Sequence, residues 1–193
     1  MGRPPLISRE TLLQAAREVF VSDGLQASIR DVAARAGISE AAIFKRFATK
    51  AELIIAAMAP PAPDVARILA PLDAGDLRSG LCAAMANIVD YFREVLPVVL
   101  PVIVQSDVGL KGFADRVGES SATTLNAALA DRFARAVNDR KIAPVQPFAA
   151  AGLIVATAHS IVLFEIMGLH GGATPPAVLD AMVDTLWKGL RPR

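Results

Sequence analysis

Lys45 and Arg46 are the neighbouring side chains whose types suggest the clearest chemistry in this sequence. A lysine or arginine can donate hydrogen bonds to the O6 and N7 atoms of guanine, and either can instead pair with a phosphate. Both roles require an element that brings the side chain to its ligand. The pattern between Ser28 and Leu53 predicts such an element.

Residues 28–53 contain signals for the start and the end of a short helix. Ser28 followed by Asp31 predicts a capping box, in which the hydroxyl accepts from a helix N–H and the carboxylate accepts in return. Apolar residues then recur at helical spacing. Gly37 can end this helix, because glycine adopts the left-handed conformation at little steric cost. Ser39 can cap a second helix.

That second helix is predicted from about Glu40 to Phe47. A third begins at Thr49, where Glu52 repeats the capping pattern. Two helices joined by a glycine-containing turn of about three or four residues form the helix-turn-helix plan, whose second helix lies in the DNA major groove. An ordinary small helical bundle is the alternative, since helix–glycine–helix sequences are common.

The residue types in the first quarter of the chain favour the DNA-binding interpretation. They are Ala15, Ala16, Phe20, Gly24, Ile29, Asp31, Val32, Ala33, Ala36, Gly37, Ser39, Ile43, Phe44, Phe47, Lys50 and Leu53. With these residues, the segment resembles the N-terminal DNA-binding domain of the TetR (tetracycline repressor) family of bacterial regulators. The resemblance runs without a gap and implies a homodimer whose larger domain binds a small effector.

The helices and the resemblance together predict a set of contacts with double-stranded DNA. Arg46 is expected at a phosphate, because the family more often has a Tyr or His there that touches the DNA backbone. Phe44 stands where the family commonly has tyrosine, so it can only pack or touch a thymine methyl group. Glu40 could accept from a cytosine amino group, or simply favour the helix N-terminus. The full candidate set is Ser28, Arg30, Ser39, Glu40, Ala41, Ala42, Phe44, Lys45, Arg46, Thr49 and Lys50.

The composition predicts an all-α protein. Hydrophobic residues make up 53% of the 193 residues and aromatic residues only 5%, a composition that suits helices better than a β-sandwich. The formal net charge of +1 is too small for a large basic field, so DNA affinity would depend on placed contacts and on dimerisation. The single cysteine, Cys82, excludes an intramolecular disulfide. The N-terminal segment lacks the apolar core of a signal peptide, so a cytoplasmic protein is expected.

Pro60 and Pro61 mark the predicted boundary between two domains. Residues 1–58 would form the helix-turn-helix domain, and residues 59–193 a larger helical effector-binding and dimerisation domain. Proline cannot continue an α-helix without loss of a hydrogen bond. The family's fourth helix usually continues into the second domain, and here it should break near Pro60. For the same reason, a later helix is expected to end at Pro97, before a short helix within residues 95–104.

Phe148–Leu169 is an apolar segment long enough to span a membrane. His159 and Glu165 lie within it, however, and ionisable groups are costly at bilayer depth. A buried or subunit-interface helix is therefore predicted, with a membrane-anchored helical protein as an alternative. The resemblance assigns the homodimer interface to the last two helices.

The resemblance also implies an effector pocket between helices of the second domain. A mostly apolar lining predicts a hydrophobic or aromatic effector of low charge, although each candidate residue could equally be packed core. The candidates are Met85, Ile88, Val89, Phe92, Ile103, Phe133 and His159.

The sequence thus predicts a ligand-responsive, homodimeric repressor that binds a palindromic operator and is released by a small hydrophobic effector. No constellation for catalysis, metal or cofactor emerges, because His159 and His170 have no partner at metal-ligand spacing. Cys82 could sense redox state, although a lone cysteine on an apolar helix face is usually core. The alternative is a protein of the same fold that has lost specific DNA recognition and acts through a ligand or a partner protein.

Overall fold

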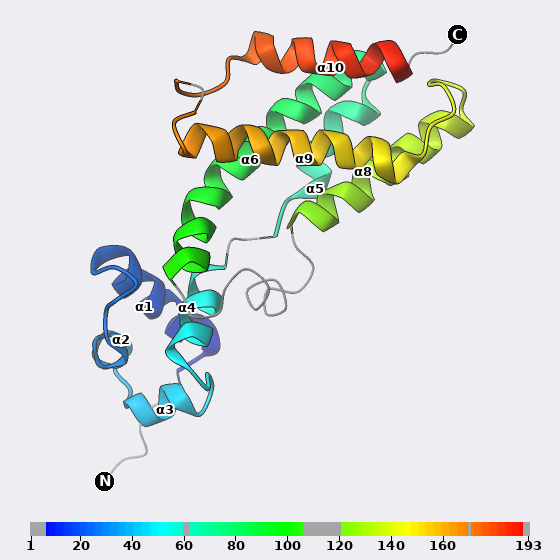
Figure 1. The fold of residues 1–193 in the computed structure, drawn as a ribbon. Coiled ribbons are helices and arrows are strands. Elements are labelled where there is room, and N and C mark those ends of the chain that lie inside the picture. Colours follow the sequence, from blue (N-terminus) through cyan, green and yellow to red (C-terminus); the bar gives the residue numbers. More distant parts are fainter. Residues whose placement is uncertain (1–6, 60–61, 106–120, 170, 191–193) are drawn as a thin grey trace. The chain divides into compact units, whose positions relative to one another are not determined.

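The computed structural model describes residues 7–59, 62–105, 121–169 and 171–190. Within these ranges every regular element is a helix, which confirms the all-α prediction (Figure 1). The elements are α1 (Arg9–Ser22), α2 (Ile29–Ala36), α3 (Glu40–Phe44), α4 (Lys50–Met58), α5 (Val65–Leu69), the 3₁₀ helix η1 (Ala70–Asp73), α6 (Leu77–Gln105), α8 (Ser121–Asn138), α9 (Pro147–Ile166) and α10 (Pro176–Leu190).

The chain divides into two compact units. One contains α1 to α4 together with the end of α6 from Val98 onward. The other contains α5, η1, the rest of α6 and α8 to α10. The predicted division between residues 58 and 59 stays a prediction, and the grouping of residues after Val98 with the N-terminal helices was not foreseen from the sequence.

In the N-terminal unit, α1 packs against α2 and α4, and α2 packs against α3. The apolar residues of α1 recur three and four positions apart, so they form one stripe that turns inward. Leu12, Val32, Ile43 and Leu53 are completely buried in the shared core, and Val102 from α6 belongs to the same cluster. The short helices of this unit are therefore held by one apolar core.

Arg17 on α1 closes the C-terminal end of α4. Its Nε donates to the carbonyl of Ala57 at 2.8 Å and its Nη2 donates to the carbonyl of Ala59 at 2.9 Å. These carbonyls belong to the end of α4, where no further helix N–H follows to bond them. The helix ends at Met58, as the following prolines lead one to expect, while Pro60 and Pro61 themselves lie outside the described residues.

The predicted end of a helix at Pro97 is wrong, because α6 continues through Pro97 and Pro101 to Gln105. Each proline removes one helix hydrogen bond and presses on the preceding turn. The two prolines are four positions apart, so they share one face of the helix, and both are exposed. Water can therefore solvate the carbonyls that they leave without an N–H partner, and the helix persists.

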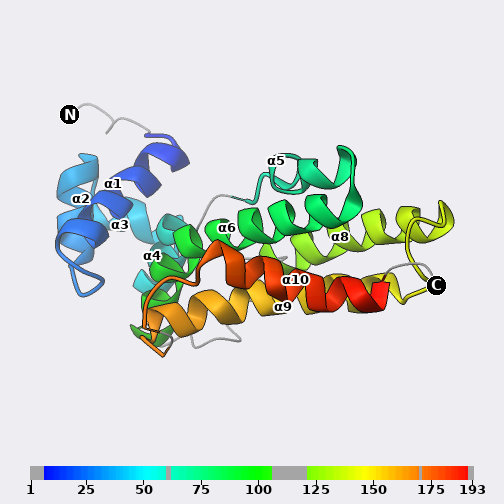
Figure 2. The same ribbon diagram turned by 90° about the horizontal axis from the view of Figure 1, so that it is seen from above.

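In the second unit, α8 packs against both α9 and α5. Figures 1 and 2 show α9 and α10 running in opposite directions beside each other. By length and composition α9 is apolar enough to cross a membrane, which is weak evidence by itself. Six residues of α9 between Ala151 and Val162 are nevertheless buried within the protein, as in the core helix of a bundle.

Arg93 links the middle of α6 to the end of α9. Its Nε and Nη2 donate to the two oxygens of the Glu165 carboxylate at 3.0 and 2.9 Å, and Nη2 also donates to the Thr174 carbonyl at 3.3 Å. The Thr174 N–H donates to the same carboxylate at 2.6 Å. The hydrogen bonds from Arg93 lower the pKa of Glu165 to about 2. This cluster ties the end of α9 to Thr174, just before the start of α10.

We predict that Glu165→Gln lowers the free energy of unfolding by about 2 kcal/mol at pH 7, because it removes the charge that Arg93 pairs with. Glu165 is normally protonated below its ordinary pKa of 4.5, but in the folded protein its pKa is about 2. Its contribution is thus complete above pH 4.5 and is lost as the pH falls toward 2. Urea unfolding at several pH values measures this difference.

Asp90→Asn is the matched control. Asp90 also accepts from Arg93, at 2.9 Å, but its side chain is 66% exposed. An exposed pair contributes little, so we expect a change within about 0.5 kcal/mol. Equal losses in the two variants, or a Glu165→Gln effect that persists unchanged at pH 2, would contradict the assignment.

Candidate nucleic-acid interface

The turn between α2 and α3 is held by side chains that satisfy the helix ends. The Asp31 carboxylate accepts from the Ser28 N–H at 2.9 Å, and the Asp31 N–H donates to the Ser28 hydroxyl at 3.2 Å. The hydroxyl's own hydrogen bond to this carboxylate, together with the backbone bond, lowers the pKa of Asp31. Gly37 ends α2 with φ at 67°, the left-handed conformation expected of it. The Ser39 hydroxyl then accepts from the Ala42 N–H at 3.2 Å.

α3 ends at Phe44, three residues earlier than the sequence predicts. Lys45 occupies the C-cap position, and the next residues form a turn. Phe47 is the cause, because its side chain is only 4% exposed and has to enter the core below the helix. The ring of Phe47 also lies under the Arg9 guanidinium, 5.6 Å from the ring centroid. This contact was not foreseen, since sequence spacing gives no sign of it.

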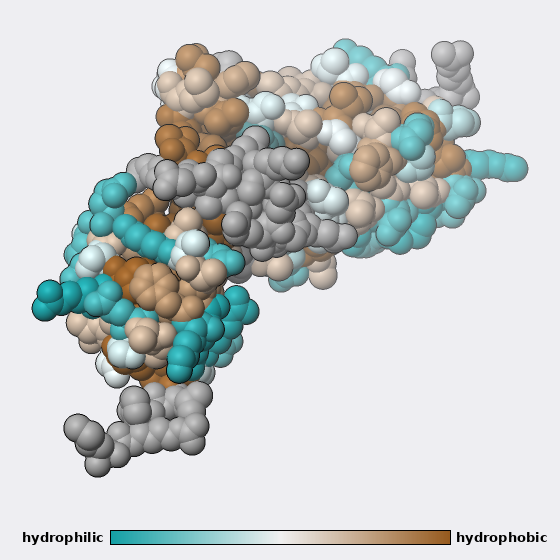
Figure 3. Space-filling view, turned by 60° about the horizontal axis from the view of Figure 1, so that its bottom comes forward, coloured by the Kyte–Doolittle hydropathy of each residue, from teal (hydrophilic) through white to brown (hydrophobic). Residues whose placement is uncertain are grey.

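One side of α3 faces the core and the other is open. Ile43 is completely buried and Ala42 is half-buried. The residues on the open side are Ser39, Glu40, Ala41, Phe44, Lys45 and Arg46, and the Phe44 ring is 48% exposed. Figure 3 shows the N-terminal unit with hydrophilic side chains around an apolar centre. A helix with small exposed residues, followed at once by the two exposed cations Lys45 and Arg46, has the form needed to enter a groove of DNA.

The remaining DNA candidates lie at the N-terminal ends of α2 and α4. Ser28 caps α2, and Arg30 is exposed in its first turn. Thr49 caps α4 and accepts from the Glu52 N–H at 3.1 Å, while Lys50 is the half-buried first residue of that helix. Free N–H groups and the helix dipole favour an anion at such ends. The structure therefore brings the predicted set to α3 and to two helix starts in one unit.

Arg46 makes intramolecular hydrogen bonds. Its Nη2 donates to the Ile7 carbonyl at 2.8 Å, and its Nη1 approaches the Ser8 carbonyl at 3.5 Å. The side chain thereby ties the end of the helix-turn-helix to the start of α1. No local pattern in the sequence predicts these contacts, because the partners are backbone atoms 38 and 39 positions away. Contact of Arg46 with phosphate stays a prediction.

Most of the effector candidates lie in the packed core, and their role in effector binding stays a prediction. Met85, Ile88, Val89, Phe92 and Phe133 are at most 2% exposed and form part of the core. Ile103 is half-buried in the part of α6 that belongs to the other unit. His159 lines a groove of about 400 Å³ between α8 and α9. Other residues that line this groove include Thr123, Asn126, Phe148, Gly152 and Val155.

His159 packs edge-on against Phe92, with ring centroids 5.2 Å apart. Burial lowers the pKa of His159, so its imidazole is neutral at pH 7. The groove therefore receives no positive charge from this histidine.

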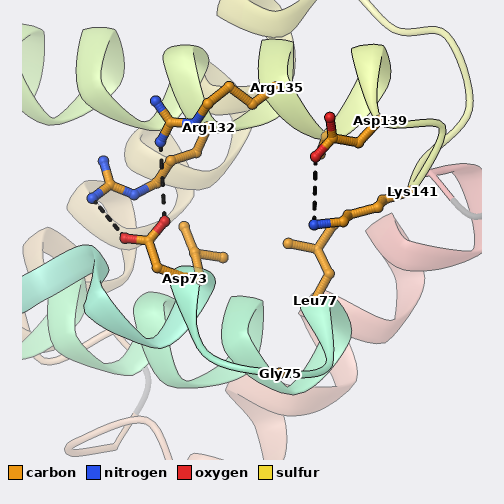
Figure 4. A pocket seen from close by; sticks show the side chains of 9 residues that line it. Asp73, Gly75, Leu77, Arg132, Arg135, Asp139 and Lys141 are labelled. Carbon is orange, nitrogen blue, oxygen red and sulfur yellow. Dashed lines mark hydrogen bonds and ion pairs between the residues drawn. The ribbon is translucent and has the colours of Figure 1, made fainter.

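A second hollow, of about 270 Å³, has charged walls (Figure 4). Arg132 on α8 donates to the Asp73 carboxylate at 3.1 Å, and Lys141 lies 3.5 Å from the Asp139 carboxylate. Each cation thus already has an anionic partner. Within the described ranges, no three His, Cys, Asp or Glu side chains are close enough together to hold a metal ion.

Cys82 is half-buried on α6. Burial, followed by the nearby Asp180 carboxylate, raises the pKa of its thiol. A raised pKa lowers the fraction of thiolate, which is the form that reacts with oxidants and disulfides.

The arrangement of α2, the glycine turn and α3 is a helix-turn-helix motif. Residues 12–57 match the family described as "Bacterial regulatory proteins, tetR family". This match to the N-terminal segment confirms the resemblance seen in the sequence. No curated protein matches the sequence significantly.

Solved structures share the fold over nearly the whole chain. A TetR-family transcriptional regulator from Pectobacterium atrosepticum is 23% identical, with a TM-score of 0.67, over 96% of this chain and 94% of its own. The flavonoid-responsive regulator FrrA is 19% identical, with a TM-score of 0.68, over 95% and 97%. FadR from Bacillus subtilis, solved with stearoyl-CoA, is 15% identical, with a TM-score of 0.61, over 94% and 96%.

We predict that Cys82 in the folded protein reacts more slowly with an aromatic disulfide reagent at pH 8 than it does in the urea-unfolded chain. Burial and the carboxylate of Asp180 both disfavour the thiolate. Absorbance of the released thiolate gives both rates, and the unfolded chain serves as the control for the reagent. An equal or faster reaction in the folded protein would restore Cys82 as a candidate redox sensor.

Proposed function

We propose that the protein is a cytoplasmic transcriptional repressor that binds a palindromic operator as a homodimer and is released by a small hydrophobic effector. The observation that carries this proposal is the capped, glycine-linked pair α2 and α3 inside the segment that matches the family. The family fold points to a regulator rather than an enzyme.

On DNA, α3 lies in the major groove. Lys45 reaches a guanine edge or a phosphate, and Phe44 packs against a thymine methyl group. Ala41 and Ala42 are small enough for the helix to lie deep in the groove. Glu40 lies in the first turn of α3, where its charge suits the helix dipole.

Phosphates flanking the groove are bound at the starts of α2 and α4. Arg30 and Lys50 supply charge there, and Ser28, Ser39 and Thr49 supply hydroxyls as well as caps. Arg46 supports the interface mainly through its hydrogen bonds to the start of α1.

Dimerisation is assigned to α9 and α10 because both helices present large apolar side chains to solvent. Such a surface is unusual for a soluble monomer and typical of a subunit interface. Two copies joined in this way present two helix-turn-helix motifs to successive major grooves of a palindromic site. The exposed residues outside the α8–α9 groove are Leu153, Phe164, Ile166, Val178 and Met182 on these helices and Met167 at the C-cap of α9.

The effector is assigned to the groove between α8 and α9. Proteins of this fold include one named for its response to flavonoids, which supports a largely apolar, aromatic ligand. An effector that binds the free protein better than the DNA-bound protein would release the operator, because it shifts the equilibrium by that difference in affinity.

We predict that Lys45→Ala weakens binding to operator DNA about tenfold, the usual loss for one good contact to a base or phosphate. The DNA comes from beside the protein's own gene, and a gel shift at several salt concentrations measures affinity. Lys141→Ala is the control, because Lys141 is an exposed lysine in the other unit and lies outside α9 and α10. If wild-type protein forms no salt-sensitive complex, the protein has lost DNA recognition.

We predict that the double variant Ile166→Glu, Met182→Glu is monomeric, because two carboxylates would be buried in the interface. Light scattering after gel filtration distinguishes dimer from monomer. Val21→Glu is the matched control, since Val21 is a 69% exposed apolar residue on α1 in the other unit. A wild-type monomer, or dissociation by the control as well, would remove α9 and α10 as the interface.

A further inference from the structure

The groove between α8 and α9 contains a buried polar atom with an unmet hydrogen-bonding requirement. Asn126 on α8 lines this groove and is only 9% exposed. Its Oδ1 is buried and accepts no hydrogen bond from the residues that the structure describes. Buried amide oxygens are almost always paired with a donor, because an unpaired one forfeits the bonds it makes with water.

The side of Asn126 Oδ1 toward α9 is kept open by a glycine. Gly152 lines the same groove, and a Cβ atom at this position would stand 3.7 Å from Oδ1. The side chain of any other residue would be in van der Waals contact with the oxygen on this side. The last torsion of an asparagine side chain is soft, so a modest rotation turns Oδ1 toward the groove. A donor that enters over Gly152 can then reach it.

The other residues that line the groove restrict the kind of ligand that can bring this hydrogen-bond donor. None of the described residues that line the groove has a formal charge, and most of the lining is apolar, with the Phe148 ring 55% exposed. A carboxylate or an ammonium group would lose its hydration here without gaining a counter-ion. An apolar molecule without a donor would leave Asn126 unpaired.

We propose that this groove binds a small, neutral, largely aromatic molecule through one hydroxyl or N–H group that donates to Asn126 Oδ1. A volume of about 400 Å³ is within the usual range for small-molecule sites. A phenol meets both requirements, because its ring packs on Phe148 and its hydroxyl is neutral at pH 7. This proposal rests on the proposed effector role of the groove and specifies the chemical class of the ligand.

The test uses three naphthalenes that differ in one group: 2-naphthol, 2-methoxynaphthalene and 2-naphthoate. Calorimetric titration of the full-length protein at pH 7, without DNA, measures each affinity. We expect 2-naphthol to bind roughly tenfold more tightly than 2-methoxynaphthalene, the usual difference for one hydrogen bond to a buried group. 2-Naphthoate should bind more weakly than 2-naphthol, because its charge has no partner.

Two variants assign this preference to Asn126. Asn126→Leu should abolish the difference between 2-naphthol and 2-methoxynaphthalene while it leaves binding of 2-methoxynaphthalene within about threefold. Gly152→Ala should weaken 2-naphthol binding with Asn126 intact, and alanine suits a helix interior, so the variant should fold. Thr185→Ala, an exposed position on α10, is the control and should bind as wild type.

Three results would overturn the proposal: no binding of any probe, equal affinity for the two neutral probes, or a preference that survives in Asn126→Leu. Equal affinity would mean that a water molecule alone serves Asn126. These outcomes are separate from the DNA-binding test. If 2-naphthol binds as expected but does not change the gel shift, the ligand site stands and its effector role fails.

Discussion

The direction of α3 depends on hydrogen bonds at its ends and on one buried side chain. A helix of five residues is far too short to be stable in water, where even ~12–15 residues are marginal. Here the Ser39 hydroxyl satisfies its first turn, Gly37 allows the sharp approach from α2, and Ile43 anchors it to the core. Because these constraints use only the inner side of the helix, its outer side is left for side chains that need no internal partner.

In the second unit, an ion pair rather than helix caps fixes the position of the helices. The bidentate pair of Arg93 with Glu165, joined by the Thr174 N–H, fixes where α9 ends and the chain to α10 begins. Because this charged network holds the ends of α9 and α10 in place, the neighbouring surface of the two helices can remain apolar. Exposed residues such as Ile166 and Met182 would otherwise favour collapse onto the nearest apolar surface.

Local signals in the sequence predict the helix-turn-helix, but they do not predict the long-range hydrogen bonds that hold it in place. Ser28, Asp31 and Gly37 act on atoms within a few positions, so their roles follow from spacing alone. Arg17 and Arg46 bond to carbonyls about forty positions away, and no local pattern reveals such partners. The continuation of α6 through Pro97 was missed because helix-breaking tendency ignores whether the freed carbonyl can be solvated.

The residues predicted to line an effector pocket show why a pocket is hard to predict from apolar periodicity. Apolar periodicity identifies which residues turn inward, and Met85, Ile88 and Phe92 do so, but a packed core and a ligand cavity have the same periodicity.

A buried polar atom that packing leaves without a hydrogen-bond partner can distinguish a ligand cavity from a packed core. Asn126 Oδ1 is such an atom. In the sequence, Asn126 is simply one polar residue in the helical pattern of α8. Gly152, 26 positions away, lies next to this oxygen and lines the same groove, which the sequence pattern of α8 does not show. A ligand site in a helical bundle is therefore better sought from unpaired buried polar atoms than from apolar stripes.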